Sequence, residues 1–319
     1  MALAQTNNPY LEAMEEDVLY HLGLSTSTHD LAAMFGDIRF VCMGGTPQRM
    51  ENFAKFIMKE IDHVLQPGTC LQDISRHSHR YAMFKVGPVL CISHGMGVPS
   101  MSIVLHEVIK LLSHAKARDP VFFRLGTCGG VDVDPGNVVI TEEALDGLLR
   151  PVFENIILGK IVQRPTQVDP MVIESLMKLG EKMKFTTVTG RTLCTNDFYE
   201  GQGRVDGAFC NYTKEDKMEY MNHLKQVGVK NIEMESTCFT AMTHMAKCRS
   251  AVICVVLVNR LCGDQILATK ETMIEWQNRP QQLVAAYIKQ QLKIETQVPS
   301  KSEMFRFGGY EDDQQTERT

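Results

Sequence analysis

The chain has 319 residues, of which 44% are hydrophobic, and a formal net charge of -5. It therefore has enough apolar side chains for a full core, in one large α/β domain or in two small ones. The acidic balance, without a dominant basic run, argues against a nucleic-acid-binding protein. No apolar run reaches membrane-spanning length, and the N-terminus lacks the basic-then-apolar pattern of a secretion signal.

The ten cysteines are scattered singly along the chain. Because none forms a Cys-x-x-Cys pair or a His/Cys cluster, we expect neither a bound metal nor a disulfide framework. A reducing, cytoplasmic location fits this pattern.

The first half of the chain alternates strand and helix patterns. Residues 1–36 form a polar N-terminal lead with short helical turns. An apolar run at 38–43 ends in Gly44 and Gly45, which predicts a buried strand followed by a tight turn. An irregular loop at 62–79 precedes predicted strands at 81–85 and 88–93, a helix at 100–114 with Ser100 as N-cap, and short strands at 121–125 and 137–141.

The second half repeats this alternation. Helices are predicted at 171–184, 214–226 and 234–247, and a strand at 186–190. The continuous apolar run at 251–258 is typical of a strand buried on both faces. A long amphipathic helix follows at 270–294, interrupted near Pro280, and 295–319 form a polar C-terminal tail. We therefore predict an α/β fold, with one domain over 37–294 built on a mixed central β-sheet flanked by helices.

Two glycine-containing strand ends carry an arginine. Gly44 and Gly45 expose backbone N–H groups just before Arg49, which suits an anion; taken alone, an ordinary glycine turn is favoured. Arg124 closes an apolar strand, and a buried guanidinium needs a negative partner. That partner is either a bound anion, to which Thr127 could also donate, or an internal carboxylate.

Two further segments suit a sugar and a planar base. A carboxylate such as Glu235 can accept hydrogen bonds from vicinal hydroxyls, whereas Glu233 is better explained as a helix N-terminal acid. In the segment 198–204, Phe198 offers a stacking face, Gln202 an amide that both donates and accepts, and Arg204 a cation for negative charge on a heterocycle. A glycine-rich surface turn is the plain alternative. His94 and His106 are interpreted as structural.

Together and in this order, these segments resemble the nucleoside phosphorylase family, and within it the uridine branch. Residues 93–108, SHGMGVPSMSIVLHEV, are similar to the family signature of Gly-x-Gly, Pro-Ser and a downstream Glu. The Phe-Tyr-x-Gly-Gln-x-Arg segment at 198–204 separates the uridine branch from purine members. The resemblance covers nearly the whole chain, from about Asn8 to about Leu292. It implies a nucleoside phosphorylase-like fold and reversible phosphorolysis of uridine to uracil and ribose 1-phosphate, without a cofactor and with phosphate as co-substrate.

The resemblance also implies a role for individual residues in a homodimer whose active site is shared. Phosphate would be bound by Gly45, Arg49, Arg124 and Thr127, with Arg80 from the neighbouring subunit. Ribose would be held by Met234 and Glu235, with His21 reaching across the interface to the 5′-hydroxyl. Uracil would be bound by Phe198, Gln202, Arg204 and Arg260, between walls supplied by Val256, Leu257 and Ile266. Gln202, Arg204 and Arg124 would carry the catalysis.

Two positions refine this expectation. Arg260 stands where purine-cleaving relatives carry an acid, which favours a pyrimidine substrate. Cys128 stands where relatives often have Ser or Thr, and a thiol is a weak donor. The open alternatives are a phosphorylase with a thymidine or broader nucleoside range, and a catalytically impaired nucleoside-binding homologue. A Rossmann dinucleotide binder is disfavoured, since the chain lacks a GxGxxG turn.

Overall fold

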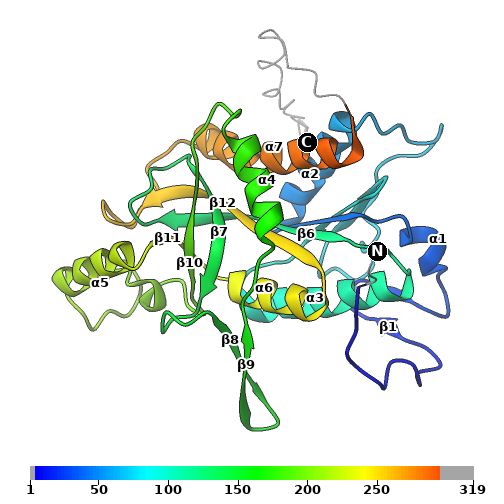
Figure 1. Ribbon diagram of the computed structural model, residues 1–319, viewed down its shortest axis with the longest axis horizontal. Coiled ribbons are helices and arrows are strands. Elements are labelled where there is room, and N and C mark those ends of the chain that lie inside the picture. Colours follow the sequence, from blue (N-terminus) through cyan, green and yellow to red (C-terminus); the bar gives the residue numbers. More distant parts are fainter. Residues whose placement is uncertain (1–3, 295–319) are drawn as a thin grey trace, which may run out of the picture.

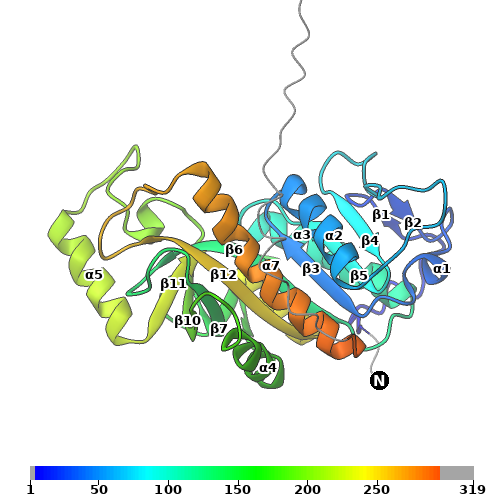
Figure 2. The same ribbon diagram turned by 90° about the horizontal axis from the view of Figure 1, so that it is seen from above.

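The computed structural model describes residues 4–294, so the tail predicted at 295–319 lies outside the described residues. Eight strands form the main sheet: β3 (Phe40–Gly44), β4 (Met83–Val86), β5 (Val89–Ser93), β6 (Val121–Gly130), β7 (Val138–Leu145), β10 (Thr187–Cys194), β11 (Val229–Glu233) and β12 (Arg249–Asn259). Their order is β11-β10-β7-β12-β6-β3-β5-β4; Figure 1 labels the strands from β11 to β6, and Figure 2 labels the whole sheet. The sheet is mixed, because β12 runs parallel to β6 but antiparallel to β7.

One half of the sheet closes on itself. Besides its neighbour β10, β11 pairs with β6, through Asn231 opposite Gly130 and Ile232 opposite Gly129. The strands β11, β10, β7, β12 and β6 therefore form a closed ring, while β3, β5 and β4 extend from it as an open wing (Figure 2). The carboxyl ends of β3 and β5 meet beside the middle of β6, since Gly44 pairs with both Ser93 and Leu125.

Helices cover both faces of the sheet. They are α1 (Leu31–Phe35), α2 (Pro47–Glu60), α3 (Gly97–His114), α4 (Pro170–Gly180), α5 (Lys214–Gln226), α6 (Ser236–Met245) and α7 (Lys270–Leu292). Alternate residues of β3 point to opposite faces: Val41 and Met43 pack in the core with α1, α3 and α6, and Phe40 and Cys42 in the core with α2, α4 and α7. Figure 1 shows α2 and α7 above the sheet and α3 and α6 below it.

The predicted α/β fold with a mixed central sheet is confirmed, as are the strands β3, β4, β5 and β12 and the helix α5. Predicted strands ended too early where glycines follow. β6 continues through Gly126 and Gly129 to Gly130, because both partner strands keep pairing with this stretch. β11 was missed, and so was the hairpin of β8 (Val152–Ile157) and β9 (Lys160–Pro165). The predicted lead contains the short strands β1 (Val18–Leu19) and β2 (Leu24–Ser25) besides α1.

Two details of the predicted helices are wrong. Ser100 does not cap α3, which begins three residues earlier at Gly97 after Met96. The Ser100 hydroxyl instead donates to the carbonyl oxygen of His94 at 2.6 Å. α7 runs without interruption through Pro280. A proline inside a helix removes one backbone hydrogen bond, and here the buried face of α7 around Leu283 and Val284 outweighs that loss.

Candidate active site

Arg49 and Arg124 come together where β3 and β5 end, beside the middle of β6. Arg49 lies in the first turn of α2, whose N-cap Thr46 accepts a hydrogen bond from the Arg49 backbone at 3.3 Å. A Cβ placed on Gly45 would lie 3.7 Å from the Arg49 guanidinium, in ordinary van der Waals contact, so Gly45 lies beside this side chain. Burial, and then the charge of Arg124, lower the pKa of Arg49. The two guanidinium groups are therefore close enough to repel each other.

Arg124 is buried and paired with two carboxylates. Its Nη2 lies 3.0 Å from Glu233 and also bonds Glu235, while Nη1 donates to the Cys254 sulfur at 3.0 Å. The internal Arg–carboxylate pair that the sequence left open is thus present. Burial disfavours the charged guanidinium, but the two carboxylates outweigh it and raise the pKa of Arg124 well above its usual value. Arg124 stays positively charged.

The two acids have different neighbours. Glu233 accepts hydrogen bonds at 2.9 Å from the backbone N–H groups of Glu235 and Ser236, as expected of an acid at the N-terminus of α6. Glu235 instead reaches the start of α3, where its Oε1 accepts from the Gly97 backbone at 2.5 Å. Glu235 thereby joins the starts of α3 and α6 to Arg124. Met234, between the acids, is half-buried.

Several buried nitrogen atoms around Arg124 lack a hydrogen-bond partner. Within residues 4–294, Nε of Arg49, Nε of Arg124 and both ring nitrogens of His94 are buried without a hydrogen-bond partner. The His94 side chain is 2% exposed, and burial, followed by the charge of Arg124, lowers its pKa to about 3. Buried polar groups are normally paired. We call Arg49, His94, Arg124, Glu233 and Glu235 the guanidinium cluster.

The segment predicted to bind a base is rigidly held. Glu200–Gln202 form a single 3-10 turn that ends at Gly203 in the left-handed conformation. Gln202 is buried, and Arg260 donates to its backbone oxygen at 2.8 Å and to its amide oxygen at 3.5 Å. The Arg204 guanidinium lies 4.5 Å from the centre of the Phe198 ring. The structure thus brings Phe198, Gln202, Arg204 and Arg260 together.

This base segment adjoins the guanidinium cluster. The backbone N–H of Thr195, just upstream of the segment, donates to the backbone carbonyl oxygen of Glu233 at 2.9 Å. Arg260 packs on β6, where a Cβ on Gly129 would lie 2.9 Å from its Cγ. Half-buried Thr127 precedes Gly129 on the same strand, and the thiol of Cys128 between them donates to the Val255 oxygen at 3.4 Å.

The remaining predicted residues are dispersed. Val256 is buried in the core, Leu257 is half-buried and Ile266 is 42% exposed. Exposed Arg80 follows the loop 62–79, next to Tyr81, whose ring lies 6.4 Å from that of His21. His21 is held by Glu107, with Nδ1 to carboxylate 2.6 Å. No recorded contact among the described residues links His21 or Arg80 to the guanidinium cluster of the same chain.

Sequence reasoning missed the acids that hold the site's cations. Asp264 accepts hydrogen bonds from Nε of Arg260 at 3.0 Å and from the Lys217 ammonium at 2.7 Å. Asp206 forms an ion pair with Arg204. Lys217 is 47 residues from Asp264, so no local pattern connects them. Asp206, two residues after Arg204, was the one that a local pattern could have indicated.

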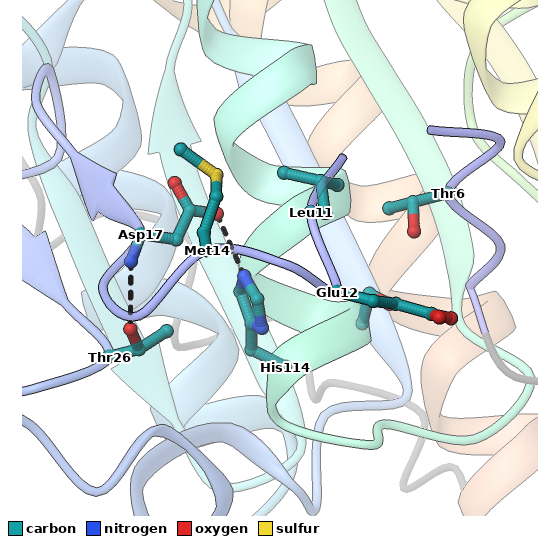
Figure 3. Close-up of a pocket in the computed structure, with 8 residues that line it drawn as sticks. Thr6, Leu11, Glu12, Met14, Asp17, Thr26 and His114 are labelled. Atoms are coloured by element: carbon teal, nitrogen blue, oxygen red, sulfur yellow. Dashed lines mark hydrogen bonds and ion pairs between the residues drawn. The ribbon is translucent and has the colours of Figure 1, made fainter. Parts of the chain in front are cut away.

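One pocket lies elsewhere, against the N-terminal lead (Figure 3), with a volume of about 340 Å³. It is lined by Thr6, Leu11, Glu12, Met14, Asp17, Thr26, Ser113 and His114. Asp17 fastens the lead to α3 there, through His114 at 2.8 Å and Lys110 at 2.6 Å. None of the sequence-predicted site residues lines this pocket.

Residues 4–294 contain no group of three or more His, Cys, Asp or Glu side chains able to hold a metal ion. Within the same residues, no helix is both long and apolar enough to span a bilayer.

In this α/β fold, buried arginine nitrogens without a partner lie near a segment that carries an amide, a guanidinium and an aromatic ring. Residues 39–289 match the model of the Phosphorylase superfamily, and the chain belongs to that family. It is 49% identical over 288 residues to mouse (Mus musculus) uridine phosphorylase 2, covering 90% of each chain. The uridine and thymidine phosphorylase of Caenorhabditis elegans is 46% identical, with 90% of this chain and 96% of that protein covered.

The fold comparison agrees. A crystal structure of the uridine phosphorylase from Schistosoma mansoni in complex with thymidine superposes with a TM-score of 0.87. Its sequence is 39% identical, and the match covers 91% of this chain and 99% of that one. The similarity therefore extends over nearly the whole fold.

Proposed function

We propose that this enzyme catalyses the reversible phosphorolysis of uridine to uracil and ribose 1-phosphate in pyrimidine salvage, in the cytoplasm, with phosphate as co-substrate and no cofactor. The observation that carries the proposal is the pairing of two features. Buried Gln202 and Arg204 offer an amide and a guanidinium to a base. Beside them, the guanidinium cluster has buried donors without acceptors. A bound phosphate would supply the missing acceptors of the guanidinium cluster, and a pyrimidine would bind to Gln202 and Arg204.

Phosphate would be held by Gly45, Arg49, Arg124 and Thr127, with Arg80 supplied by a second copy of the chain. An anion there would accept from the unpartnered nitrogens of Arg49 and Arg124. Arginine and phosphate form strong charge-assisted hydrogen bonds. The site would therefore place the nucleophile, and the phosphate charge would stabilise the positive ribosyl centre of an oxocarbenium-like transition state.

Ribose would lie between the phosphate and the base, held by Met234 and Glu235. Glu235 is oriented for this by Arg124 and Gly97, and these bonds still leave lone pairs that can accept from vicinal hydroxyls. His21 from the second copy would bind the 5′-hydroxyl. This arrangement requires a homodimer with a shared site.

Uracil would stack on Phe198 and bond to Gln202 and Arg204, which oppose the negative charge growing on the leaving base. Such preorganised donors are typically worth about 2.7–4 kcal/mol each. Uracil leaves as an anion without protonation of a ring nitrogen, so no general acid is needed. Arg260 cannot supply one for a purine, and its guanidinium is already bound to Gln202 and Asp264.

The test is the ultraviolet absorbance change of uridine with the purified protein, with and without phosphate, and with inosine in parallel. We expect phosphate-dependent release of uracil and no cleavage of inosine. Cleavage of inosine at a comparable rate would contradict the base assignment. Calorimetric binding of uridine without cleavage would support the catalytically impaired homologue instead.

Thymidine is a second candidate substrate. It is favoured by the name of the Caenorhabditis elegans relative and by the thymidine complex of the Schistosoma mansoni enzyme. The ratio of kcat/KM for uridine and thymidine, measured in the same assay, decides between a uridine-selective and a broader enzyme.

A further inference from the structure

Asp206 holds Arg204 by two parallel hydrogen bonds. Arg204 Nε donates to Oδ1 at 2.8 Å and Nη2 donates to Oδ2 at 2.6 Å. The carboxylate is itself anchored, since Oδ2 also accepts from the Gln265 amide. The hydroxyl of Tyr212 donates to the Arg204 backbone oxygen at 2.5 Å. The backbone and the guanidinium group of Arg204 are therefore both held in place.

The second constraint on Arg204 is aromatic. Its guanidinium lies 4.5 Å from the centre of the Phe198 ring and 5.7 Å from that of Tyr199. Cation–π contact and a bidentate carboxylate together define the plane of the guanidinium as well as its position. The pair uses the N–H of Nε and one N–H of Nη2, so the edge formed by Nη1 and the second N–H of Nη2 is the one left for a substrate.

An unheld arginine would make a poor catalytic donor. Its side chain has many rotamers, and donors stabilise developing charge best when they need no reorganisation as the reaction proceeds. Asp206 removes that freedom before the substrate arrives. It does so from outside the segment 198–204, at a side chain 23% exposed.

We propose that Asp206 is a positioning residue for departure of the base: it holds Arg204 so that the free Nη1 edge faces the negative charge that develops on the leaving pyrimidine. This inference rests on the proposed function. It predicts that Asp206 acts on the chemical step rather than on phosphate binding.

The protein contains a matched control. Arg150 and Asp146 form a comparable two-bond pair outside the predicted site, in which Nε at 2.8 Å and Nη2 at 2.6 Å both donate to Oδ2. This pair is partly exposed, and such pairs contribute little to stability. Asp206→Asn and Asp146→Asn each remove one carboxylate charge from an arginine pair, so they separate catalytic positioning from a general loss of one salt bridge.

The experiment measures kcat and both KM values for wild type, Asp206→Asn, Asp206→Glu and Asp146→Asn, with uridine and with 5-fluorouridine. Fluorine withdraws electrons, so 5-fluorouracil leaves more readily and depends less on Arg204. We expect Asp206→Asn to lower kcat for uridine by about tenfold or more, and KM for phosphate to change by less than about twofold. The loss should be smaller with 5-fluorouridine, Asp206→Glu should recover part of it, and Asp146→Asn should match wild type.

Two results would overturn the proposal: unchanged kcat in Asp206→Asn, or an equal loss on both nucleosides accompanied by a lowered melting temperature. Failure of the proposed function is recognised separately, as wild-type protein that releases no uracil. In that case calorimetric titration with uracil decides, because Asp206→Asn should weaken binding and Asp146→Asn should not. Equal uracil affinity in all variants would then reject the positioning role.

Discussion

At the residue scale, Gly129 shows how closely the predicted base pocket is packed. A Cβ there would lie 2.9 Å from Cγ and 3.0 Å from Cδ of Arg260. Arg260 has little room to yield, since Asp264 and Gln202 bind its guanidinium. The glycine is therefore required by a neighbouring side chain rather than by its own backbone.

Gly129→Ala should displace Arg260 and, through it, Gln202. We expect kcat/KM for uridine to fall by about tenfold, while KM for phosphate changes little, because a shift near the reacting groups is costly. Steady-state kinetics with each substrate varied in turn test this. Gly147→Ala is the control, because a Cβ at Gly147 meets nothing within 4 Å. Similar kinetics for the two variants would refute the packing argument.

His94 should make stability depend on pH. It lies among Arg49, Arg124 and Glu235, and its pKa in the folded protein is lowered to about 3. An unfolded histidine titrates near 6.5, so below that pH the unfolded state binds a proton that the folded state does not. The stabilisation is complete above pH 6.5 and is lost as the pH falls. It should decrease by about 1 kcal/mol between pH 7.5 and 5.5.

Chemical denaturation at these two pH values measures the effect. The free energy of unfolding of His94→Asn should decrease less than that of the wild type over this interval, since only the wild type has the buried imidazole. Equal decreases in both proteins would show that His94 does not titrate as the structure indicates.

Single residues also show what local sequence can predict. Gln202 and Arg204 could be selected because they lie within one seven-residue segment with an aromatic neighbour. The partners of Arg124 could not be chosen, because Glu235 is 111 residues away and only the meeting of β6 with the start of α6 brings it close. The acids that orient Arg204 and Arg260 were missed, because a charged side chain gives no sign of its partner.

At the element scale, Glu107 of α3 holds the N-terminal lead in place. Its carboxylate accepts from the backbone of His21 at 2.9 Å and of Leu22 at 3.0 Å, and it lies 2.6 Å from His21 Nδ1. One side chain thus fixes both the lead and the ring that is proposed to reach the 5′-hydroxyl of a neighbouring subunit's substrate.

Glu107→Gln replaces one accepting oxygen by a donor and should loosen His21. The preference for uridine over 5′-deoxyuridine should then shrink, by up to about tenfold in kcat/KM, because the lost contact is to the 5′-hydroxyl. Activity on the two nucleosides measures this. Asp17→Asn, which weakens the same lead at His114 and Lys110, is the control and should keep the preference. An unchanged preference in Glu107→Gln would argue against the role of His21.

Elements were predicted best where composition is uniform. The apolar run of β12 and the polar–apolar period of α5 were readable from sequence. Glycines misled the prediction in β6, since a strand paired on both sides keeps its course through them. The hairpin β8–β9 was missed because its strands are largely exposed and lack a buried apolar face.

At the scale of the whole molecule, the proposed site needs two copies of the chain. Among the described residues, no hydrogen bond or ion pair links His21 or Arg80 to the guanidinium cluster of the same chain, and both residues are proposed to contact substrate bound to the other copy. Arg80→Ala should therefore inactivate the neighbour's site, whereas Arg204→Ala should inactivate the site of its own chain.

Mixing these two variants should restore activity. With random pairing, half of the dimers are mixed and each contains one intact site, so about a quarter of wild-type activity should return. The activity of an equal mixture after dissociation and reassociation tests this. A mixture no more active than its components would contradict a shared site.

Phosphorolysis is tested by the ratio of ribose 1-phosphate formed to uracil released, followed by phosphorus NMR and ultraviolet absorbance in one reaction of uridine with phosphate. We expect one ribose 1-phosphate for each uracil and no uracil without phosphate. Uracil released together with free ribose, at a rate that phosphate does not change, would show a hydrolase and contradict it.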